Sequence, residues 1–258
     1  MMRRPSCAVI RRNEPFVDRI REIKADHPFW GYRRIWAHLK FVDHLPVNKK
    51  RILRLMRKND LLVKPNLRLR AKRTSMRAKP QAVHPNEWWG IDMTKVLVQN
   101  FGWIYVVLVL DWYSKKIVGY YAGLQCKGVH WQAALNMAVN RQFPTGARGH
   151  ELHLMSDNGC QPTSLGFMEA CHAMGINQAF TSYNNPKGNA DTERMMRTLK
   201  EEILWLREWN SPFELAKELE KWIEQYNRSY LHSALGYKAP EQYEIEFQNS
   251  HIAQLVAP

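Results

Sequence analysis

From residue 87 onwards, three strand-like segments follow one another and then alternate with helical segments, an order that restricts the possible folds more than any other feature of this chain. The first three, at 88–98, 103–111 and 116–122, are rich in Val, Ile, Leu, Trp and Tyr. The first two are separated by Gln99-Asn100-Phe101-Gly102, which has the character of a hairpin turn. Consecutive antiparallel strands are therefore predicted.

The remaining segments alternate in type. Helices are predicted at 129–142, 164–174, 192–205 and 212–229, and short strands at 151–156 and 176–180. The resulting order, β-β-β-α-β-α-β-α-α, is the topology of the ribonuclease-H-like fold. This is an α/β fold in which a mixed five-stranded sheet carries helices on both faces.

The first third of the chain has a different pattern, with apolar residues at helical spacing in 14–25, 32–41 and 47–61. Pro28, Gly31 and Pro46 separate these segments, which predicts a small all-α, helix-turn-helix-like domain. Its third helix is strongly basic and suited to DNA contact, although a solvated face on an ordinary helical bundle would look the same. The proposed DNA-contact residues of this helix are Lys49, Lys50, Arg51, Arg54, Arg57 and Lys58.

The basic charge is confined to this part of the chain. Residues 1–84 carry 23 Lys and Arg against 6 Asp and Glu, whereas residues 85–258 carry 15 against 18. Such asymmetry indicates a polyanionic partner, with a well-solubilised surface as the alternative. Residues 64–84 lose apolar periodicity and are expected to form a linker that follows phosphates. Its proposed DNA contacts are Arg68, Arg70, Lys72 and Arg73.

No apolar run approaches the length of a membrane helix, so a cytoplasmic, nucleoid-associated location is expected. The four cysteines lie far apart and show no zinc-site spacing, so neither a disulfide framework nor a structural zinc is expected.

Three acidic residues occupy positions at which a fold of this type places its chemistry. Asp92 lies in mid-strand among apolar neighbours, Asp157 ends a short strand, and Glu193 begins a long helix. Each alone could be a turn, cap or helix-dipole residue. Together they suit phosphoryl transfer, which uses two divalent cations held by carboxylates. We therefore predict that they bind two Mg²⁺ or Mn²⁺ ions.

Other acids lie near these three in the sequence. Asp191 points away from Glu193 on a helix, and Glu201 and Glu202 lie on a helix expected to be largely exposed. Asp111 ends the second strand and is the best alternative ligand.

The same residues carry a family resemblance. W-x-x-D-x-T (Trp89–Thr94), S-D-N-G (Ser156–Gly159) and E-x6-K (Glu193–Lys200) resemble the motifs of DDE transposases of bacterial insertion sequences, whose core is similar to that of retroviral integrase. Within them the chain most resembles the second-reading-frame product, OrfB, and it shares H-P-x-x-G-Y-R-R-I (His27–Ile35) and H-S-A-L-G-Y-x-x-P (His232–Pro240). The loop at 183–191 and the Glu-Arg-Met-Met start of the following helix differ from the sequence that is more common in this family.

The resemblance implies metal-dependent DNA strand cleavage and strand transfer, with Asp92, Asp157 and Glu193 as catalytic metal ligands. Arg197 and Lys200 lie on the helical face of Glu193 and, with Lys187 and Gln161, are the expected DNA contacts of this region. The implied partners are the terminal inverted repeats of the element, target DNA, further copies of the chain and a first-frame product, OrfA. A nuclease of the same fold and a DNA-binding regulator are the alternatives.

These features divide the chain into a basic helical region at 1–63, a basic linker at 64–84, an integrase-like core at 85–245 and a C-terminal tail at 246–258.

Overall fold

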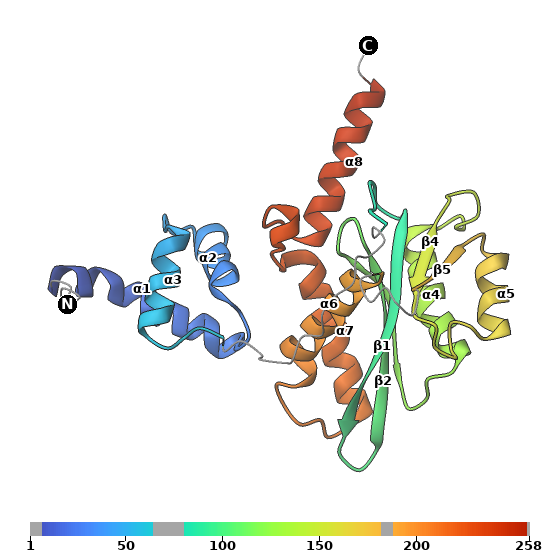
Figure 1. The fold of residues 1–258 in the computed structure, drawn as a ribbon, viewed down its shortest axis with the longest axis horizontal. Coiled ribbons are helices and arrows are strands. Elements are labelled where there is room, and N and C mark those ends of the chain that lie inside the picture. The colour runs from blue at the N-terminus through green and yellow to red at the C-terminus, as the bar shows by residue number, and fades with distance from the viewer. Residues whose placement is uncertain (1–6, 64–79, 182–187, 257–258) are drawn as a thin grey trace, which may run out of the picture. The chain divides into compact units, whose positions relative to one another are not determined.

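The protein divides into two compact units in the computed structural model, which describes residues 7–63, 80–181 and 188–256. The first unit comprises Met1–Arg73 and Leu231–Tyr237, and the second comprises Thr74–Tyr230 and Lys238–Pro258. Helices make up the first unit, and the second is built around a sheet (Figure 1). Within the described residues, no helix is long and apolar enough to cross a membrane.

The first unit contains α1 (Cys7–Asp26), α2 (Tyr32–Phe41) and α3 (Lys49–Lys58). The apolar residues that recur at helical spacing form its core, in which Ile20, Ile35 and Ile52 are completely buried. The predicted small helical region is confirmed. α1 begins earlier than the predicted residue 14, because it accommodates Pro15 inside the helix rather than in its first turn.

The segment Leu231–Tyr237 also belongs to this unit, although in sequence it lies between the two parts of the second unit, Thr74–Tyr230 and Lys238–Pro258. It includes a short 3₁₀ helix, η2 (Ser233–Leu235). The Tyr237 hydroxyl accepts a hydrogen bond from Lys49 Nζ at 3.1 Å, and the Tyr237 ring lies edge-on to Trp36 with centroids 5.1 Å apart. Lys49 Nζ also lies 4.1 Å from the Trp36 ring centroid, a cation–π distance.

The second unit contains a five-stranded sheet in the order β3-β2-β1-β4-β5. Its strands are β1 (Trp88–Val98), β2 (Gly102–Asp111), β3 (Ile117–Gly123), β4 (His153–Ser156) and β5 (Asn177–Phe180). β1 to β3 are antiparallel, whereas β4 pairs in parallel with β1 and with β5. The predicted mixed sheet and ribonuclease-H-like topology are therefore confirmed.

Helices cover both faces of this sheet (Figure 1). α4 (Gly128–Gln142) and α5 (Leu165–Ala173) enclose a core with Trp89, Ile91 and Trp131 at its centre. α6 (Ala190–Leu199) and α7 (Pro212–Ser229) lie on the other face, and α6 continues directly into a π-helix, η1 (Lys200–Leu204). The predicted helix at 192–205 is thus an α-helix followed by a π-helical turn.

A last helix, α8 (Pro240–Val256), was not predicted from the sequence. α8 spans residue 245, where the sequence analysis predicted the boundary between the core and the C-terminal tail. Its start is held by buried Glu244, which pairs with Lys116 at 2.6 Å. Because that partner is 128 residues away, local sequence carries no sign of it.

Candidate active site

Asp92 lies on the α6 side of β1. Side chains alternate along a strand, and Trp89 and Ile91 belong to the core beneath α4, so Asp92 faces the opposite way. Its carboxylate accepts a hydrogen bond from the Met93 backbone N–H at 2.7 Å. The pKa of Asp92 is raised to about 6. Burial is the largest cause; the charges of Asp157 and Glu193 also raise the pKa, whereas the Met93 hydrogen bond and the charge of Lys200 lower it.

Asp157 follows β4 directly. The parallel register pairs Trp88 with His153 and Gly90 with Met155, so two further residues bring Asp157 level with Asp92. The Asp157 side chain is exposed and accepts a hydrogen bond from the Gly159 N–H at 3.1 Å. The turn after β4 thus presents this carboxylate to solvent at the carboxyl end of the strand, where α/β sheets commonly place reactive groups.

Glu193 lies in the first turn of α6, and its backbone N–H donates to the Asn189 carbonyl at 3.0 Å. The side chain is exposed at the helix surface, and partial burial raises the pKa of Glu193. α6 packs on both β1 and β2, which carries Glu193 to the face of the sheet on which Asp92 lies.

Asp92, Asp157, Glu193 and Lys200 therefore converge, since the charge of each of the other three acts on Asp92. Among the described residues, no three Asp, Glu, His or Cys side chains are arranged to hold one ion together. The donor set nevertheless suits a hard divalent cation, because carboxylate oxygens are the ligands that Mg²⁺ and Mn²⁺ prefer and water or substrate oxygens can supply the others. The negative charges of Asp157 and Glu193 acting on half-buried Asp92 are the electrostatic condition that a cation relieves.

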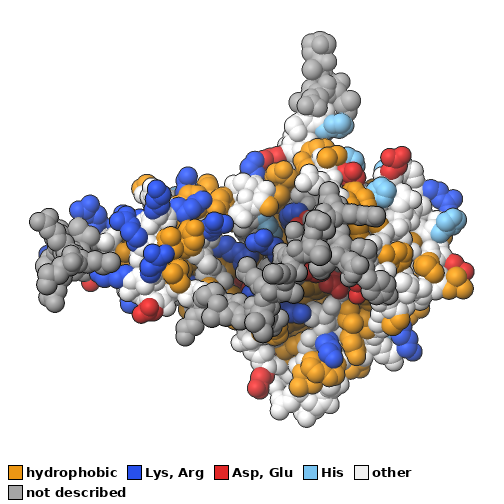
Figure 2. Space-filling model, viewed as in Figure 1, with side chains coloured by type: hydrophobic (Ala, Val, Ile, Leu, Met, Phe, Trp, Pro, Cys, Tyr) orange, Lys and Arg blue, Asp and Glu red, His pale blue; other side chains and the backbone are white. Residues whose placement is uncertain are grey.

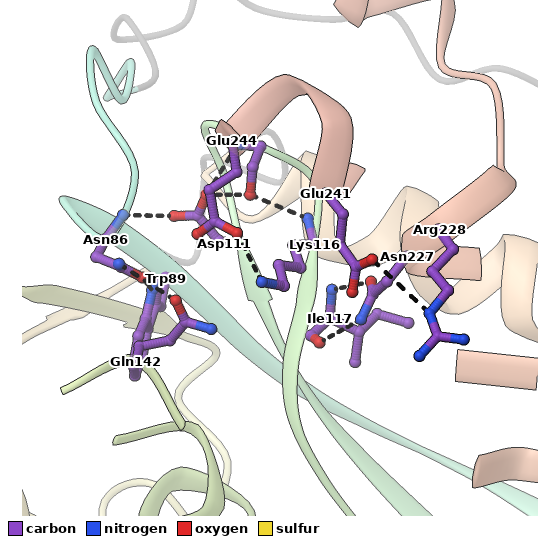
Figure 3. A network of polar contacts seen from close by, with 11 residues as sticks. Asn86, Trp89, Asp111, Lys116, Ile117, Gln142, Asn227, Arg228, Glu241 and Glu244 are labelled. Atoms are coloured by element: carbon purple, nitrogen blue, oxygen red, sulfur yellow. Dashed lines mark hydrogen bonds and ion pairs between the residues drawn. The ribbon is translucent and has the colours of Figure 1, made fainter. Parts of the chain in front are cut away.

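Asp111, which the sequence indicated as the best alternative ligand, is not among the residues whose charge acts on Asp92. It pairs in register with Trp89, near the start of β1 and three residues before Asp92. Asp111 is fully buried and accepts hydrogen bonds from Asn86 N–H, Ser114 N–H and Ser114 Oγ at 3.0, 2.8 and 2.6 Å. Figure 3 shows it near Asn86, Lys116 and Glu244; the contact with α8 in this network is the ion pair between Lys116 and Glu244. Burial raises the pKa of Asp111 to about 6.

The other neighbouring acids also have structural partners. Asp191 pairs with Lys115 at 3.0 Å, and Glu201 pairs with Arg197 at 2.7 Å. Glu202, which lies in the π-helical turn η1, is buried rather than exposed as predicted.

Three residues that the sequence analysis did not single out hold the start of α6. Trp112 Nε1 donates a hydrogen bond to Thr192 Oγ1 at 3.0 Å, and both side chains are buried. Lys115 Nζ bonds to Asp191 at 3.0 Å and to the Trp112 carbonyl at 2.5 Å. The contacts with Thr192 and Asp191 join residues about 80 positions apart, so no local sequence pattern predicts them.

The DNA-contact candidates of the second unit differ in their surroundings. Lys200 lies close enough to Asp92 to lower its pKa, and Arg197 is exposed beside Glu201. The Gln161 amide donates to the Cys126 carbonyl at 3.2 Å and is thereby held to the backbone. Lys187 lies outside the described residues.

The six candidates on α3 fall into two groups. Lys49 is engaged with Tyr237 and Trp36, and Arg51 is bonded to Asn13 Oδ1 at 2.7 and 3.0 Å. The other four are exposed at spacings that share one helical face: Lys50, Arg54, Arg57 and Lys58. We call this set the α3 basic face.

A groove of about 600 Å³ runs between α1 and α3 beside this face, lined by Arg12, Arg21, Arg54 and Lys58 among others. Many Lys and Arg side chains gather over this unit in Figure 2. The linker candidates Arg68, Arg70, Lys72 and Arg73 lie outside the described residues.

Three family models match the chain. Residues 82–186 and residues 174–240 each match an integrase core domain, and residues 11–68 match an HTH-like domain. The two integrase matches together span the whole sheet and its flanking helices up to the start of α8. The HTH-like match begins within α1 and includes all of α2 and α3.

Curated relatives align over most of the chain. It is 25% identical to Transposase InsD for insertion element IS2A/D/F/H/I/K of Escherichia coli over 232 residues, which is 87% of this chain and 76% of that protein. The values for Transposase InsD for insertion element IS2-9 of Escherichia coli (strain K12) are 25%, 87% and 75%. A chain of the simian T-cell lymphotropic virus intasome in complex with PP2A regulatory subunit B56 gamma superposes with a TM-score of 0.51 and 16% identity, covering 81% of this chain and 73% of that one; this likeness shows the fold.

A ribonuclease-H-like sheet with carboxylates meeting on one face, preceded by a basic helical domain, defines the class of integrase-like proteins. Metal dependence is a property of this fold class. Within that class, the chain belongs to the integrase core domain family, carries an HTH-like domain, and is homologous to the InsD transposases of insertion element IS2.

Proposed function

We infer that the protein is a DNA transposase, a DDE polynucleotidyl transferase that cleaves DNA strands and joins them at insertion-sequence ends in a metal-dependent reaction. The observation that carries this function is the convergence of Asp157, Glu193 and Lys200 on Asp92, on a sheet of integrase topology. We propose Asp92, Asp157 and Glu193 as the ligands of two Mg²⁺ or Mn²⁺ ions.

The residues around this site have distinct proposed roles. Asp92, held at mid-strand, would hold the ions together with Asp157 and Glu193. When bound, the ions would activate the attacking oxygen and stabilise the leaving oxygen, first with water and then with a DNA 3′-OH as nucleophile. Lys200, whose charge already acts on Asp92, and exposed Arg197 would bind the DNA backbone next to the scissile bond.

The α3 basic face supplies a separate proposed contact with the DNA backbone. Four exposed cations on one helical face can neutralise phosphates without rearrangement, because among the described residues no acid pairs with them. Lys49 and Arg51 are poorer candidates, since their charged groups are already held by partners within the unit.

We further propose that the element's terminal repeats and target DNA are the substrates and that several copies act together on them. A first-frame product, OrfA, is proposed as the partner that improves binding to the ends. Adding that product to this chain should increase occupancy of terminal-repeat DNA in a gel-shift assay. Equal occupancy with and without it would contradict the OrfA proposal.

The metal-ligand assignment is tested by conservative substitution. Asp92→Asn and Glu193→Gln should each reduce strand cleavage by at least about a thousandfold, because the amide cannot replace an anionic ligand, while DNA binding is retained. Glu169→Gln, which alters an exposed acid on α5, is the matched control and should cleave normally. Full cleavage by Asp92→Asn would contradict the assignment.

A strand-transfer assay with a pre-cleaved 3′ end separates this function from its two alternatives. The transposase should give a joined product with Mg²⁺ or Mn²⁺ present. A nuclease of the same fold would cleave but give no joined product, and a DNA-binding regulator would do neither.

A further inference from the structure

The first turn of α6 fits closely against β1, and the contact admits no side chain on the strand. Gly90 lies two residues before Asp92 on the same face. A Cβ atom at this position would lie 1.8 Å from Thr192 Oγ1 and 2.5 Å from Trp112 Nε1, distances that no real contact allows. The residue immediately before Glu193 is therefore in direct contact with the backbone that carries Asp92.

Trp112 and Lys115, which hold this turn, are fixed by further contacts of their own. Trp112 stacks on Trp88 with ring centroids 5.7 Å apart, and its backbone N–H donates to the Trp88 carbonyl at 2.9 Å. The Lys115 carbonyl accepts a hydrogen bond from the Tyr226 hydroxyl of α7 at 3.0 Å. The support thus extends from β1 through the β2–β3 connection to α7.

Glu193 depends on this support for its position. Among the described residues, its carboxylate has no hydrogen-bonding or ion-pairing partner, so the backbone of the first turn determines where it lies. The first turn of a helix is also where its hydrogen bonding is incomplete. Without contacts at Asp191 and Thr192, the carboxylate of Glu193 would have no defined distance from Asp92.

We propose that Gly90, Trp112 and Lys115 form a seat for α6 that holds Glu193 at metal-binding distance from Asp92. We call these three residues, with their partners Asp191 and Thr192, the α6 seat. The inference rests on the proposed metal site. The members of the α6 seat are positioning residues, because they contact the ligand-bearing backbone and not the reacting groups. Metal ligands need such support to within about 0.5 Å, and loss of a supporting contact commonly lowers metal affinity about 10- to 100-fold.

The test is direct Mn²⁺ binding by the full chain, measured by electron paramagnetic resonance in the absence of DNA. Lys115→Met removes the ion pair with Asp191, and Thr192→Val removes the acceptor of the Trp112 hydrogen bond. Each should weaken Mn²⁺ binding about tenfold or more. Lys115→Asp combined with Asp191→Lys restores an ion pair and should recover part of that loss.

Lys116→Met is the matched control. Lys116 is the next residue, is equally exposed at 19%, and also pairs with an acid, Glu244, but it supports α8 rather than α6. This variant should lower the melting temperature while leaving Mn²⁺ affinity unchanged. Thermal unfolding of every variant separates loss of metal affinity from general loss of structure, and Thr192→Val provides the measurement if Lys115→Met fails to fold.

The possible outcomes distinguish the two proposals. If Asp92→Asn abolishes Mn²⁺ binding but Lys115→Met and Thr192→Val bind as the wild type does, the α6 seat is wrong and the metal site stands. Equal weakening by Lys115→Met and Lys116→Met would also overturn the α6 seat. If the wild type shows no Mn²⁺ binding that depends on Asp92, the metal site fails, and the inference about the α6 seat fails with it.

Discussion

At the scale of single residues, the ionised carboxylate of Asp92 destabilises the folded, metal-free protein. Its pKa is raised from 3.8 to about 6, first by burial and then by the charges of Asp157 and Glu193. Between these two values the native state binds more protons than the unfolded state, so the free energy of unfolding falls as pH rises from about 4 to about 6. Near neutral pH the site therefore carries an electrostatic strain that a bound cation would relieve.

This strain predicts that Asp92→Asn stabilises the metal-free protein at pH 7. By linkage the gain is at most about 3 kcal/mol, because a shift of one pKa unit corresponds to about 1.4 kcal/mol. At pH 4 the two proteins should unfold at similar temperatures, since the carboxyl group is then protonated when folded. Thermal unfolding with a chelator present, at both pH values, measures the difference. A destabilised variant at pH 7 would contradict the prediction.

How far single residues could be predicted depends on whether their partners are local. Asp92, Asp157 and Glu193 each lie at a recognisable place in a strand or helix, so their position at one face followed from the topology. The pairs Lys115–Asp191 and Trp112–Thr192 join segments about 80 residues apart. Two of the three hydrogen bonds that occupy Asp111 depend on how the β2–β3 turn closes, which also could not be derived from residue types alone.

At the scale of elements, α3 separates its cations by function. Lys49 and Arg51 face partners in their own unit, whereas the α3 basic face is turned to solvent. The sequence predicted a basic helix but could not assign its faces, because Asn13 and Tyr237 lie far from α3 in the chain. The π-helical turn of η1 was equally unpredictable, since five residues are too few for apolar spacing to distinguish a π-helix from an α-helix.

This separation predicts different effects for cations on one helix. Arg54→Ala and Lys58→Ala should weaken DNA binding, and each should reduce the dependence of log affinity on log salt by about one, the contribution of one phosphate contact. Arg51→Ala should instead lower the thermal stability of the first unit, because the contact with Asn13 and the stacking on Phe16 at 4.4 Å are lost. Titrations at several salt concentrations decide between them. An unchanged salt slope in Arg54→Ala would exclude the α3 basic face as a phosphate contact.

At the scale of the whole molecule, the N-terminal unit is discontinuous in sequence. Its three helices come from the first quarter of the chain, but Leu231–Tyr237 returns from between α7 and α8 to pack on Trp36 and Lys49. The two sequence motifs at His27–Ile35 and His232–Tyr237 therefore meet in one unit. Because about 200 residues separate the two motifs, the sequence did not indicate this relation, and the second motif was predicted to belong to the core.

The discontinuity predicts a specific effect of Tyr237→Ala. Loss of the ring contact with Trp36 and of the hydrogen bond with Lys49 should increase hydrogen exchange of α2 and α3 amides by about tenfold or more, as expected for a loss of roughly 1.5–3 kcal/mol. Tyr243→Ala, which removes a ring contact with Tyr113 in the second unit, is the control and should leave those amides unchanged. Unaltered protection in Tyr237→Ala would contradict the prediction.

The returning segment also bears on the order in which the protein is made. The helices of the N-terminal unit leave the ribosome first, but Tyr237 is synthesised only after every strand of the sheet and after α7. The unit whose helices precede the sheet is therefore completed only after the sheet. A nascent chain that stopped before residue 231 would contain all three proposed metal ligands and the whole α3 basic face, yet the helices that carry that face would lack the aromatic contact that secures them.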